Sequence, residues 1–402
     1  MGMRLVIVSM LSAGILFGLL GLALRRKWSR AAAITSLLIV LGNLYGLPIW
    51  AMLPVLAFSA WLAWSGRPTQ RFNFIANLGT VFGTVVLILF IGIQVGQRDW
   101  FHSTETLPSV SSDLPDIYFI ILDSRTSHEV LLQRFHYDDT PFLESLTSLG
   151  FRVGDCQSLY DQTDYSVAST LNPDANLPEE SRLWEVIHNS QVRDVLEERG
   201  YQTVAFSTGF VWTEILNADI YYHPPYFLGG LNLFEIYYLN HTPFGWILGN
   251  FYDLNERMSD IYRERTQTLL THLPDASEMD SPQFVFAHIL QPHPPFVFDA
   301  EGNPANWRQY TLPGNANPAV REGYSRAGYD AGYVVAVQYV ENAILPPLRT
   351  ILSTNPNSII ILSADHGAWL ADSPEESLST FCAVYGASLP LEPRAAFEQI
   401  IK

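Results

Sequence analysis

The pattern of hydrophobic positions changes near residue 98, from long apolar stretches to short apolar runs. Before that point, four long apolar stretches follow one another: Leu5–Leu24, Ala31–Gly46, Leu47–Ser65 and Phe74–Val95. The first and last have about the 20 residues that cross a bilayer, whereas the middle two are short and interrupted by Pro48 and Pro54. We therefore predict a membrane domain over residues 1–98 with about four transmembrane helices. The middle pair forms either two tight spans or one broken hairpin.

Short apolar runs alternate with helical patterns in the rest of the chain. Residues 99–115 are polar and contain two prolines, which is typical of a linker. Four β-branched or aromatic runs then predict buried strands: Asp116–Leu122, Gln202–Phe206, Gln283–Ile289 and Ser358–Ser363. Strands that alternate with helices predict an α/β domain over residues 116–402, with a mainly parallel sheet flanked by helices.

Three helices of this domain have recognisable ends. One begins at Asp139 or Thr140, with a proline in its first turn, and stops at Gly150. The other two are predicted over Leu183–Arg199 and over Tyr324–Ile344, the latter ending before two consecutive prolines. The aromatic-rich stretch 207–282 is either an insertion or a lid over the sheet.

The charge distribution changes at the same point as the hydropathy. Residues 1–98 contain eight of the 23 Lys and Arg residues and none of the 40 acidic ones. The basic residues gather in two loops, 25–30 and 67–71, which the positive-inside rule places in the cytoplasm. The fourth span then leads outward, so we expect the acidic domain outside the cytoplasm. A domain this acidic is not a nucleic-acid-binding protein.

The chain has only two cysteines, Cys156 and Cys382, and neither belongs to a CxxC pair. A zinc ribbon or a thioredoxin-like site is therefore excluded. We expect two separate buried thiols. A disulfide between them is the alternative in an oxidising compartment.

Candidate chemistry lies at the carboxyl ends of the predicted strands, where open α/β sheets place their sites. Asp123 follows the first strand, His288 and His293 lie in and after the third, and Asp365–His366 follows the fourth. Carboxylate and imidazole are ligands for zinc or manganese. The plainer alternatives are a turn cap for Asp123, a core histidine for His288 and a surface loop residue for His293.

Four segments in this order resemble the sulfatase-like branch of the alkaline phosphatase superfamily, particularly its membrane-anchored bacterial members. They read DIYFIILDSR, YDQTDYSVASTLN, FVFAHILQPHPPFVFD and SIIILSADHG. The resemblance covers about residues 115–385. An apolar N-terminus before an external domain also resembles lipoteichoic acid synthases and phosphoethanolamine transferases.

The resemblance implies an active site. Asp123, Asp365 and His366 match the metal ligands, and Thr163 matches a metal-bound nucleophile, which is a threonine in the transferases. His293 resembles a histidine that contacts the anionic group of the substrate, and His288 assists it. Metal coordination makes a threonine hydroxyl an effective nucleophile, and histidines that titrate near neutrality can protonate a leaving alcohol.

Alternatives stay open around these residues. Thr163 is otherwise the N-cap of a helix, with Ser166 as the next nucleophile candidate. Asp161 and Asp164 are either extra ligands or, as we expect, solvated charges. Arg125 contacts an anion or forms a surface ion pair.

The sequence also departs from the family pattern. Cys156 lacks the Pro-x-Arg context of formylglycine sulfatases, which disfavours that chemistry. No histidine follows His366, so we expect one divalent metal ion, manganese or zinc rather than calcium. The arginine that relatives carry soon after the DHG motif is absent.

These observations predict a metal-dependent hydrolase of phosphate or sulfate esters, embedded in a bacterial cytoplasmic (inner) membrane and acting at its outer face. Its partners are then membrane lipid and a phosphate or sulfate ester or lipid-linked substrate. One alternative is a transferase of a phosphoglycerol or phosphoethanolamine head group to an envelope glycan or lipid. Another is an inactive envelope scaffold, motivated by the short segment after His366. A transporter is disfavoured because the apolar stretches contain no ion pair.

Overall fold

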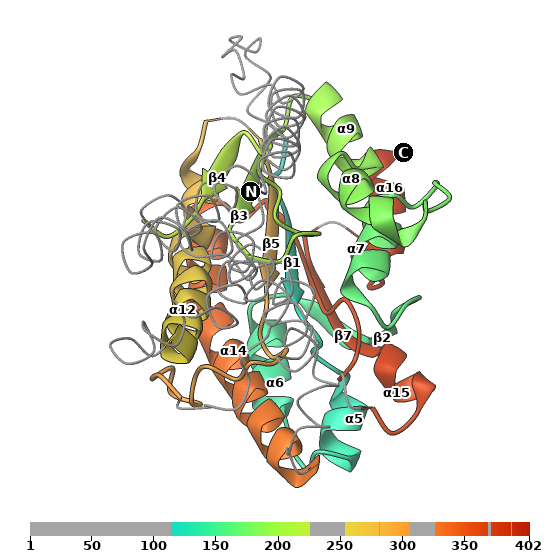
Figure 1. Ribbon diagram of the computed structural model, residues 1–402. Coiled ribbons are helices and arrows are strands. Elements are labelled where there is room, and N and C mark those ends of the chain that lie inside the picture. The colour runs from blue at the N-terminus through green and yellow to red at the C-terminus, as the bar shows by residue number, and fades with distance from the viewer. Residues whose placement is uncertain (1–113, 226–253, 281, 306–325, 369–370, 387) are drawn as a thin grey trace, which may run out of the picture. The chain divides into compact units, whose positions relative to one another are not determined.

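A sheet of seven strands, in the order β2-β7-β6-β1-β5-β3-β4, forms the centre of the described part of the chain (Figure 1). The computed structural model describes residues 114–225, 254–280, 282–305, 326–368, 371–386 and 388–402. The predicted membrane domain and nearly all of the predicted linker lie outside these ranges. Within them, no helix combines the length and the apolar character needed to cross a membrane.

The four strands predicted from apolar runs are present to within one residue. They are β1 (Ile117–Leu122), β3 (Gln202–Phe206), β5 (Gln283–Ile289) and β6 (Ile359–Ser363). Every residue of β1, β5 and β6 is buried. The strand β1 is central and pairs in parallel with β5 on one side and β6 on the other. Helices cover both faces, which explains why these strands lack hydrophobic alternation.

Three further strands complete the sheet: β2 (Arg152–Gln157), β4 (Ile220–Tyr222) and β7 (Ser379–Tyr385). The strand β7 is antiparallel to both β6 and β2, so it runs against the rest of a mostly parallel sheet. The edge strands β2 and β4 are only partly buried. Their sequences therefore carry no long apolar run, and hydropathy did not predict them.

Cys156 of β2 and Cys382 of β7 form a disulfide, with their Cα atoms 6.0 Å apart. The expectation of two separate thiols is wrong. Antiparallel pairing places Gly154 opposite Cys382, so Cys156 lies two residues along on the same face of the ladder. Sequence spacing could not show this because the two cysteines meet only through the pairing of distant strands.

Two helical layers enclose the sheet (Figure 1). One contains α7 (Thr163–Leu171), η1 (Glu180–Arg182), α8 (Leu183–His188), α9 (Gln191–Glu198) and α16 (Pro393–Ile401). On the other side lie α5 (His128–Gln133), α6 (Thr140–Ser148), α12 (Leu254–His272), η3 (Leu273–Glu278) and α14 (Arg326–Thr354). In the first layer, Phe119 packs edge-on against Phe397 at 5.0 Å between ring centroids. In the second, Tyr329 and Tyr333 of α14 are fully buried.

The helix predicted to begin at Asp139 or Thr140 and to stop at Gly150 is confirmed as α6, and Gly150 has a φ of +95°. The helix predicted over Leu183–Arg199 is instead two helices, α8 and α9. Ser190 divides them because its side chain accepts a hydrogen bond from the main-chain N–H of Arg193 and caps α9.

The prediction that a helix ends before Pro346 is also wrong, since α14 continues through both prolines to Thr354. The side chains of Ile344 and Leu348, on the two sides of the prolines, are fully buried. Burial here outweighs the local preference against proline inside a helix.

The stretch 207–282 contributes regular elements where it is described. The strand β4 extends the sheet beside β3, and α12 joins one helical layer. These parts belong to the α/β domain itself. Residues 226–253 lie outside the described ranges.

Candidate metal centre and nucleophile

The ends of three neighbouring strands bring two acids and a histidine together. The register pairs Ile121 of β1 with Ser363 of β6, so Asp123 and Asp365 follow their strands at the same level. Ile121 also pairs with His288 of β5. Ligand atoms of Asp123, His288 and Asp365 all lie within 4.8 Å of one another.

His366 completes this cluster. Its Nε2 lies 3.6 Å from Oδ2 of Asp365 and 3.8 Å from Oδ1 of Asp123. On the opposite side of Asp123, Nε2 of His288 is 3.3 Å from Oδ2. All four residues are at most 4% exposed. We call Asp123, His288, Asp365 and His366 the acid–histidine cluster.

The cluster fits a divalent cation. Oδ1 of Asp123, Nε2 of His288 and Oδ2 of Asp365 are buried and have no hydrogen-bond partner in the described residues. Buried polar atoms without partners are costly unless something binds them. Two carboxylates and two imidazoles form a ligand set suited to zinc or manganese.

Other residues orient these ligands. Nδ1 of His288 is 2.8 Å from Oγ1 of Thr213, and Nδ1 of His366 is 2.8 Å from its neighbour's carbonyl, that of Gly367. Each imidazole therefore turns Nε2 toward the carboxylates. No local sequence pattern indicates a role for Thr213, because only the fold brings it to His288.

Electrostatics within the cluster favour charged side chains. Burial opposes ionisation of Asp123, but the imidazoles of His293 and His288 outweigh it and lower the pKa to about 2. Burial likewise disfavours charge on His366, yet the Asp365 and Asp123 carboxylates raise the pKa of this histidine.

Thr163 is the first residue of α7 and lies beside the cluster. Its Oγ1 is 3.4 Å from Nε2 of His366. The N-cap residue is Gln162, so the alternative that Thr163 caps the helix is wrong. Its hydroxyl lies at the positive end of the helix dipole, where negative charge is stabilised.

The hydroxyl and acidic neighbours of Thr163 have other roles. Ser166 donates its hydroxyl proton to the main-chain carbonyl of Asp365 at 2.5 Å, so this hydroxyl ties α7 to the cluster. Asp161 is exposed, as expected for a solvated charge. Asp164 is only 8% exposed, which corrects the same expectation for it, and burial raises the pKa of its carboxyl.

His293 lies in the loop after β5 and is anchored to the site. Its main-chain N–H donates to the carbonyl of Asp123 at 3.1 Å. Its Nδ1 is 2.7 Å from the Pro294 carbonyl, and its ring centroid is 6.5 Å from that of His366. The structure thus brings all the predicted site residues together, His293 at the margin and half-buried.

Arg125 has neither of its predicted roles. It is fully buried, it forms an ion pair with Asp139 and a second one at 2.5 Å with Glu341, and it lies over the ring of Phe381. The paired carboxylates neutralise the guanidinium, which the sequence could not show because Glu341 is distant in the chain.

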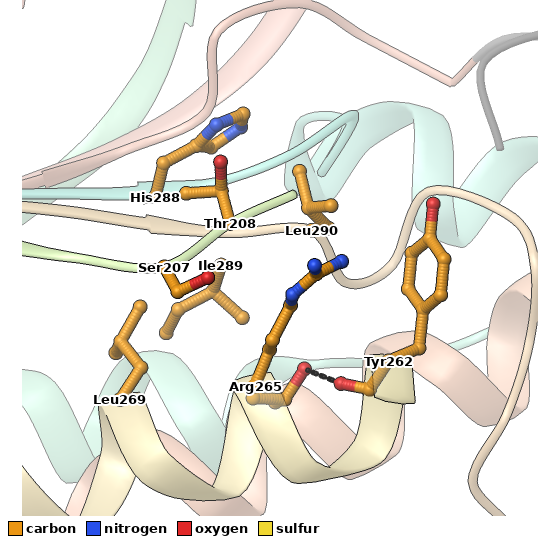
Figure 2. A pocket seen from close by; sticks show the side chains of 9 residues that line it. Ser207, Thr208, Tyr262, Arg265, Leu269, His288, Ile289 and Leu290 are labelled. Carbon is orange, nitrogen blue, oxygen red and sulfur yellow. Dashed lines mark hydrogen bonds between the residues drawn. The ribbon is translucent and has the colours of Figure 1, made fainter. Parts of the chain in front are cut away.

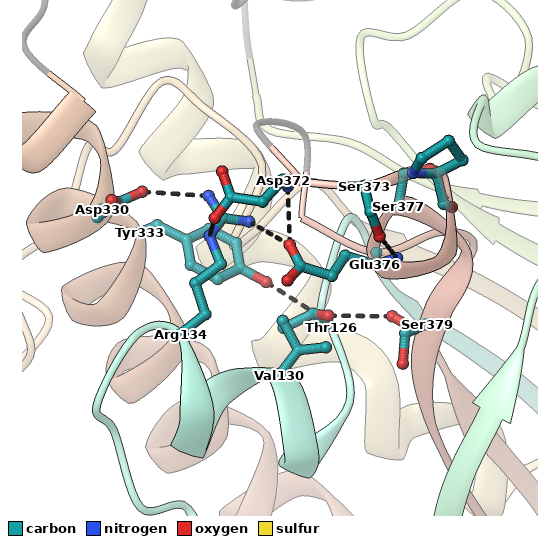
Figure 3. Close-up of polar contacts among 12 residues, drawn as sticks. Thr126, Val130, Arg134, Asp330, Tyr333, Asp372, Ser373, Glu376, Ser377 and Ser379 are labelled. Carbon is teal, nitrogen blue, oxygen red and sulfur yellow. Dashed lines mark hydrogen bonds and ion pairs between the residues drawn. The ribbon is translucent and has the colours of Figure 1, made fainter.

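The turn after His366 packs against the segment that follows it. A Cβ on Gly367 would lie 2.2 Å from the carbonyl oxygen of Glu376, so only glycine fits there. Glu376 belongs to α15 (Pro374–Leu378) and pairs with Arg134, which also pairs with Asp330 of α14 (Figure 3). These contacts connect α5, α14 and α15 around the cluster.

A mostly parallel α/β sheet with acids and histidines past its central strand ends has a possible metal site there. The family model described as Sulfatase matches residues 115–390. The chain therefore belongs to the Sulfatase family, within the alkaline phosphatase superfamily.

Several solved structures are similar to the chain. The integral membrane protein lipooligosaccharide phosphoethanolamine transferase A from Neisseria meningitidis is 14% identical, with a TM-score of 0.45, over 87% of this chain and 63% of its own length. The lipoteichoic acid synthase LtaP from Listeria monocytogenes is 9% identical, with a TM-score of 0.43, over 73% of this chain and 70% of the LtaP chain. The C-terminal periplasmic domain of EptC from Escherichia coli, in complex with zinc, is 15% identical, with a TM-score of 0.40, over 70% of this chain and 77% of the EptC domain. No curated protein matches the chain.

Proposed function

We propose that this chain is a metal-dependent hydrolase of phosphate or sulfate esters with Thr163 as its nucleophile. The observation that carries the proposal is the position of Oγ1 of Thr163, 3.4 Å from Nε2 of His366 and at the first turn of α7. The alkoxide form of a nucleophile in this position is stabilised both by a metal cation and by the positive end of the helix dipole.

The acid–histidine cluster would hold the cation, with the Thr163 hydroxyl as a further oxygen ligand. When bound, a zinc or manganese ion lowers the pKa of a coordinated hydroxyl and polarises a phosphoryl or sulfuryl oxygen. The protein supplies the orientation of the ligands through Thr213 and Ser124, which contact His288 and Asp365 respectively.

The reaction then takes two steps. Oγ1 of Thr163 loses its proton to water and bonds to phosphorus or sulfur, and the bond to the alcohol oxygen breaks. His293 donates a proton to the leaving alcohol. In the second step His293 accepts a proton from water, whose oxygen attacks the threonine ester. The bond from phosphorus or sulfur to Oγ1 breaks, phosphate or sulfate leaves, and Oγ1 takes back from water the proton that it lost in the first step.

We place the domain at the outer face of a membrane. The basic loops between the apolar stretches predict this orientation, and the Cys156–Cys382 disulfide is typical of an oxidising compartment. A lipid-linked ester of the cell envelope is then within reach. Transfer to a sugar or lipid hydroxyl follows from the same site if that hydroxyl replaces water in the second step.

The test uses the full chain purified in detergent. Turnover of p-nitrophenyl phosphate, a p-nitrophenyl phosphonate monoester and p-nitrophenyl sulfate is measured with manganese or zinc and after chelation. We expect metal-dependent turnover that Thr163→Ala lowers by at least 1,000-fold, on the order of other nucleophile losses. The preferred ester distinguishes phosphorus from sulfur.

Thr170→Ala is the matched control, because it makes the same change on the same helix, and it should keep its activity. Undiminished turnover in Thr163→Ala would contradict the role of this threonine and favour direct attack by water. Bound metal without turnover of any ester would favour the transferase, whose lipid-linked donor is then added to the assay.

A further inference from the structure

The segment of residues 207–214 follows β3 and lies beside His288. Its sequence, STGFVWTE, contains three hydroxyl side chains and one acid, and all four of these side chains are buried. Figure 2 shows Thr208 and His288 at the ends of β3 and β5, with the Thr208 hydroxyl on the side of the histidine ring. Buried hydroxyls need defined partners, so the direction of each hydrogen bond in this segment can be worked out.

The carboxylate of Glu214 fixes the first direction. Its Oε2 accepts from the main-chain N–H groups of Thr208, at 2.8 Å, and of Gly209. A main-chain N–H can only donate, so Oε2 is an acceptor, and the Thr208 hydroxyl 3.0 Å away donates its proton to it. A second acceptor for this proton, the Phe210 carbonyl, lies at 3.3 Å. With either acceptor, the Thr208 proton is not available to Thr213.

Oγ1 of Thr208 is therefore an acceptor toward its other neighbours. The main-chain N–H of Phe210 donates to it at 3.1 Å. Oγ1 of Thr213 lies 3.3 Å from it, a long hydrogen bond in which Thr213 is the donor because the Thr208 proton is already used. A hydroxyl has only one proton. Thr213 consequently offers a lone pair to Nδ1 of His288, which is 2.8 Å away.

This direction determines where the His288 ring carries its proton. A ring nitrogen that faces a hydroxyl lone pair has to donate, so Nδ1 is the protonated nitrogen and Nε2 holds the lone pair of the neutral ring. Nε2 is buried and lies 3.3 Å from Oδ2 of Asp123. A lone pair that faces a carboxylate is repelled unless a cation lies between them, and this is the arrangement of a metal-ligating histidine.

We infer that Thr208 is a positioning residue for the metal centre: through Thr213 it holds the His288 proton on Nδ1 and so leaves Nε2 for the cation. The inference rests on the proposed function for the presence of the metal ion. Thr213 alone cannot select the nitrogen, because a hydroxyl donates to an unprotonated Nδ1 as well as it accepts from a protonated one. The selection comes from Thr208, whose own proton is committed to Glu214.

The affinity of the full chain in detergent for zinc and for manganese, measured by competition with a chelating dye, tests this assignment. Without the Thr208 hydroxyl, the Thr213 proton turns to Nδ1 of His288, and the ring then carries its proton on Nε2, where it opposes the metal. We expect Thr208→Val to weaken metal binding about 2- to 10-fold, the effect of one net hydrogen bond. Thr208→Ser keeps the hydroxyl and should keep the affinity.

A double variant separates this role from general support of the fold. Thr208→Val combined with Thr213→Val should bind metal as weakly as Thr213→Val alone, because the connection to His288 is then already cut. Thr203→Val is the matched control and should leave the affinity unchanged, since it removes a buried hydroxyl that donates to Glu197 at 3.3 Å. Thermal midpoints show which variants are folded, and Thr208→Ala makes the same deletion with a smaller side chain.

Wild-type metal affinity in both Thr208→Val and Thr208→Ala would overturn the inference. Equal losses in Thr208→Ser and Thr208→Val would also overturn it, as would additive losses in the double variant. A wild type that binds neither metal would remove both the inference and the metal dependence of the proposed reaction.

Failure of the nucleophile assignment looks different. If Thr163→Ala keeps full turnover while metal affinity depends on Thr208, the assignment of Thr163 fails and the positioning role stands. If turnover depends on Thr163 but metal affinity is independent of Thr208, the reverse holds.

Discussion

The main-chain N–H of Ser124 donates a 2.9 Å hydrogen bond to Oδ1 of Asp365 and so joins the ends of β1 and β6. It occupies one carboxylate oxygen and leaves Oδ2 to the acid–histidine cluster. Ser124 adopts a φ of 65°, a left-handed conformation that costs energy in a non-glycine residue. Such strain is typical of functional sites, where the surrounding structure enforces it.

Removal of the Asp365 charge should abolish metal binding. We expect the full chain to retain about one manganese or zinc ion after dialysis, and Asp365→Asn to lose it, because an amide is a weaker ligand than a carboxylate. Mass spectrometry of the metal content provides the measurement. Asp372→Asn changes an acid whose side chain is 62% exposed and should leave the content unchanged. Equal metal content in wild type and Asp365→Asn would contradict the site.

Thr213→Val should weaken the metal site without removing a ligand. The substitution preserves volume but deletes the hydroxyl 2.8 Å from Nδ1 of His288, which holds the ring orientation. We expect metal affinity to fall about 10- to 100-fold, measured by competition with a chelating dye. Thr266→Val removes a buried hydroxyl that bonds only within α12 and serves as the control. Equal affinities would show that Thr213 does not position the ligand.

Tyr333→Phe should destabilise the domain. The Tyr333 hydroxyl donates to the carbonyl of Ser124 at 2.7 Å. It also accepts from the N–H of Thr126 at 3.0 Å (Figure 3). Its loss leaves two buried main-chain groups unpaired, so the free energy of unfolding should fall by about 1–3 kcal/mol. Denaturant titration measures it. Tyr339→Phe keeps the stacking on Phe298 and should lower the free energy of unfolding by less. A larger loss in Tyr339→Phe than in Tyr333→Phe would contradict a stabilising role for the two Tyr333 hydrogen bonds.

Stability should depend on pH through Glu341. Burial raises the pKa of this carboxyl to about 6 from 4.5, although the Arg125 guanidinium acts to lower it. The folded protein therefore holds the proton more tightly than the unfolded chain. The resulting stabilisation is complete below about pH 4.5 and is lost as the pH rises through 6.

The measurement compares wild type with Glu341→Gln, whose side chain does not titrate. From pH 4.5 to pH 7 the free energy of unfolding of the wild type should fall relative to the variant by on the order of 2 kcal/mol. If the wild type instead gains stability relative to Glu341→Gln as the pH rises, the Arg125 guanidinium outweighs burial and keeps Glu341 ionised.

Loss of the disulfide should lower stability. Cys156 and Cys382 are 226 residues apart, so the bond closes a long loop and restricts the unfolded chain. We expect Cys156→Ser with Cys382→Ser to lower the free energy of unfolding by about 2–5 kcal/mol. Thermal melting with and without reductant checks this, because the double variant should not respond to reductant. Identical melting of wild type in both conditions would indicate that the bond contributes nothing.

Strands buried on both faces could be predicted from the sequence because burial leaves a continuous apolar run, as in β1 and β6. The edge strands β2 and β4 could not, since their residues are only partly buried and their partners are distant. The break between α8 and α9 depends on one cap at Ser190, and the continuation of α14 depends on packing beyond its prolines.

The candidate site residues also divide into those with a local sequence signal and those that only the fold brings together. Asp123, Asp365 and His366 could be predicted because they directly follow recognisable strands. The sequence does not distinguish a core from a site role for His288, because its proximity to Asp123 arises from strand register. The pairing of Arg125 with Glu341 depends on α14, a helix whose placement no local pattern specifies.

The central position of β1 has a consequence for the timing of folding. Its two neighbours, β5 and β6, begin only at Gln283 and Ile359, so both edges of the first strand stay open while most of the chain is synthesised. Such long-range pairing makes folding slow. Asp123 and Thr163 emerge early, whereas the candidate ligands Asp365 and His366 emerge only after β6. The acid–histidine cluster is therefore assembled only once β6 has entered the sheet beside β1.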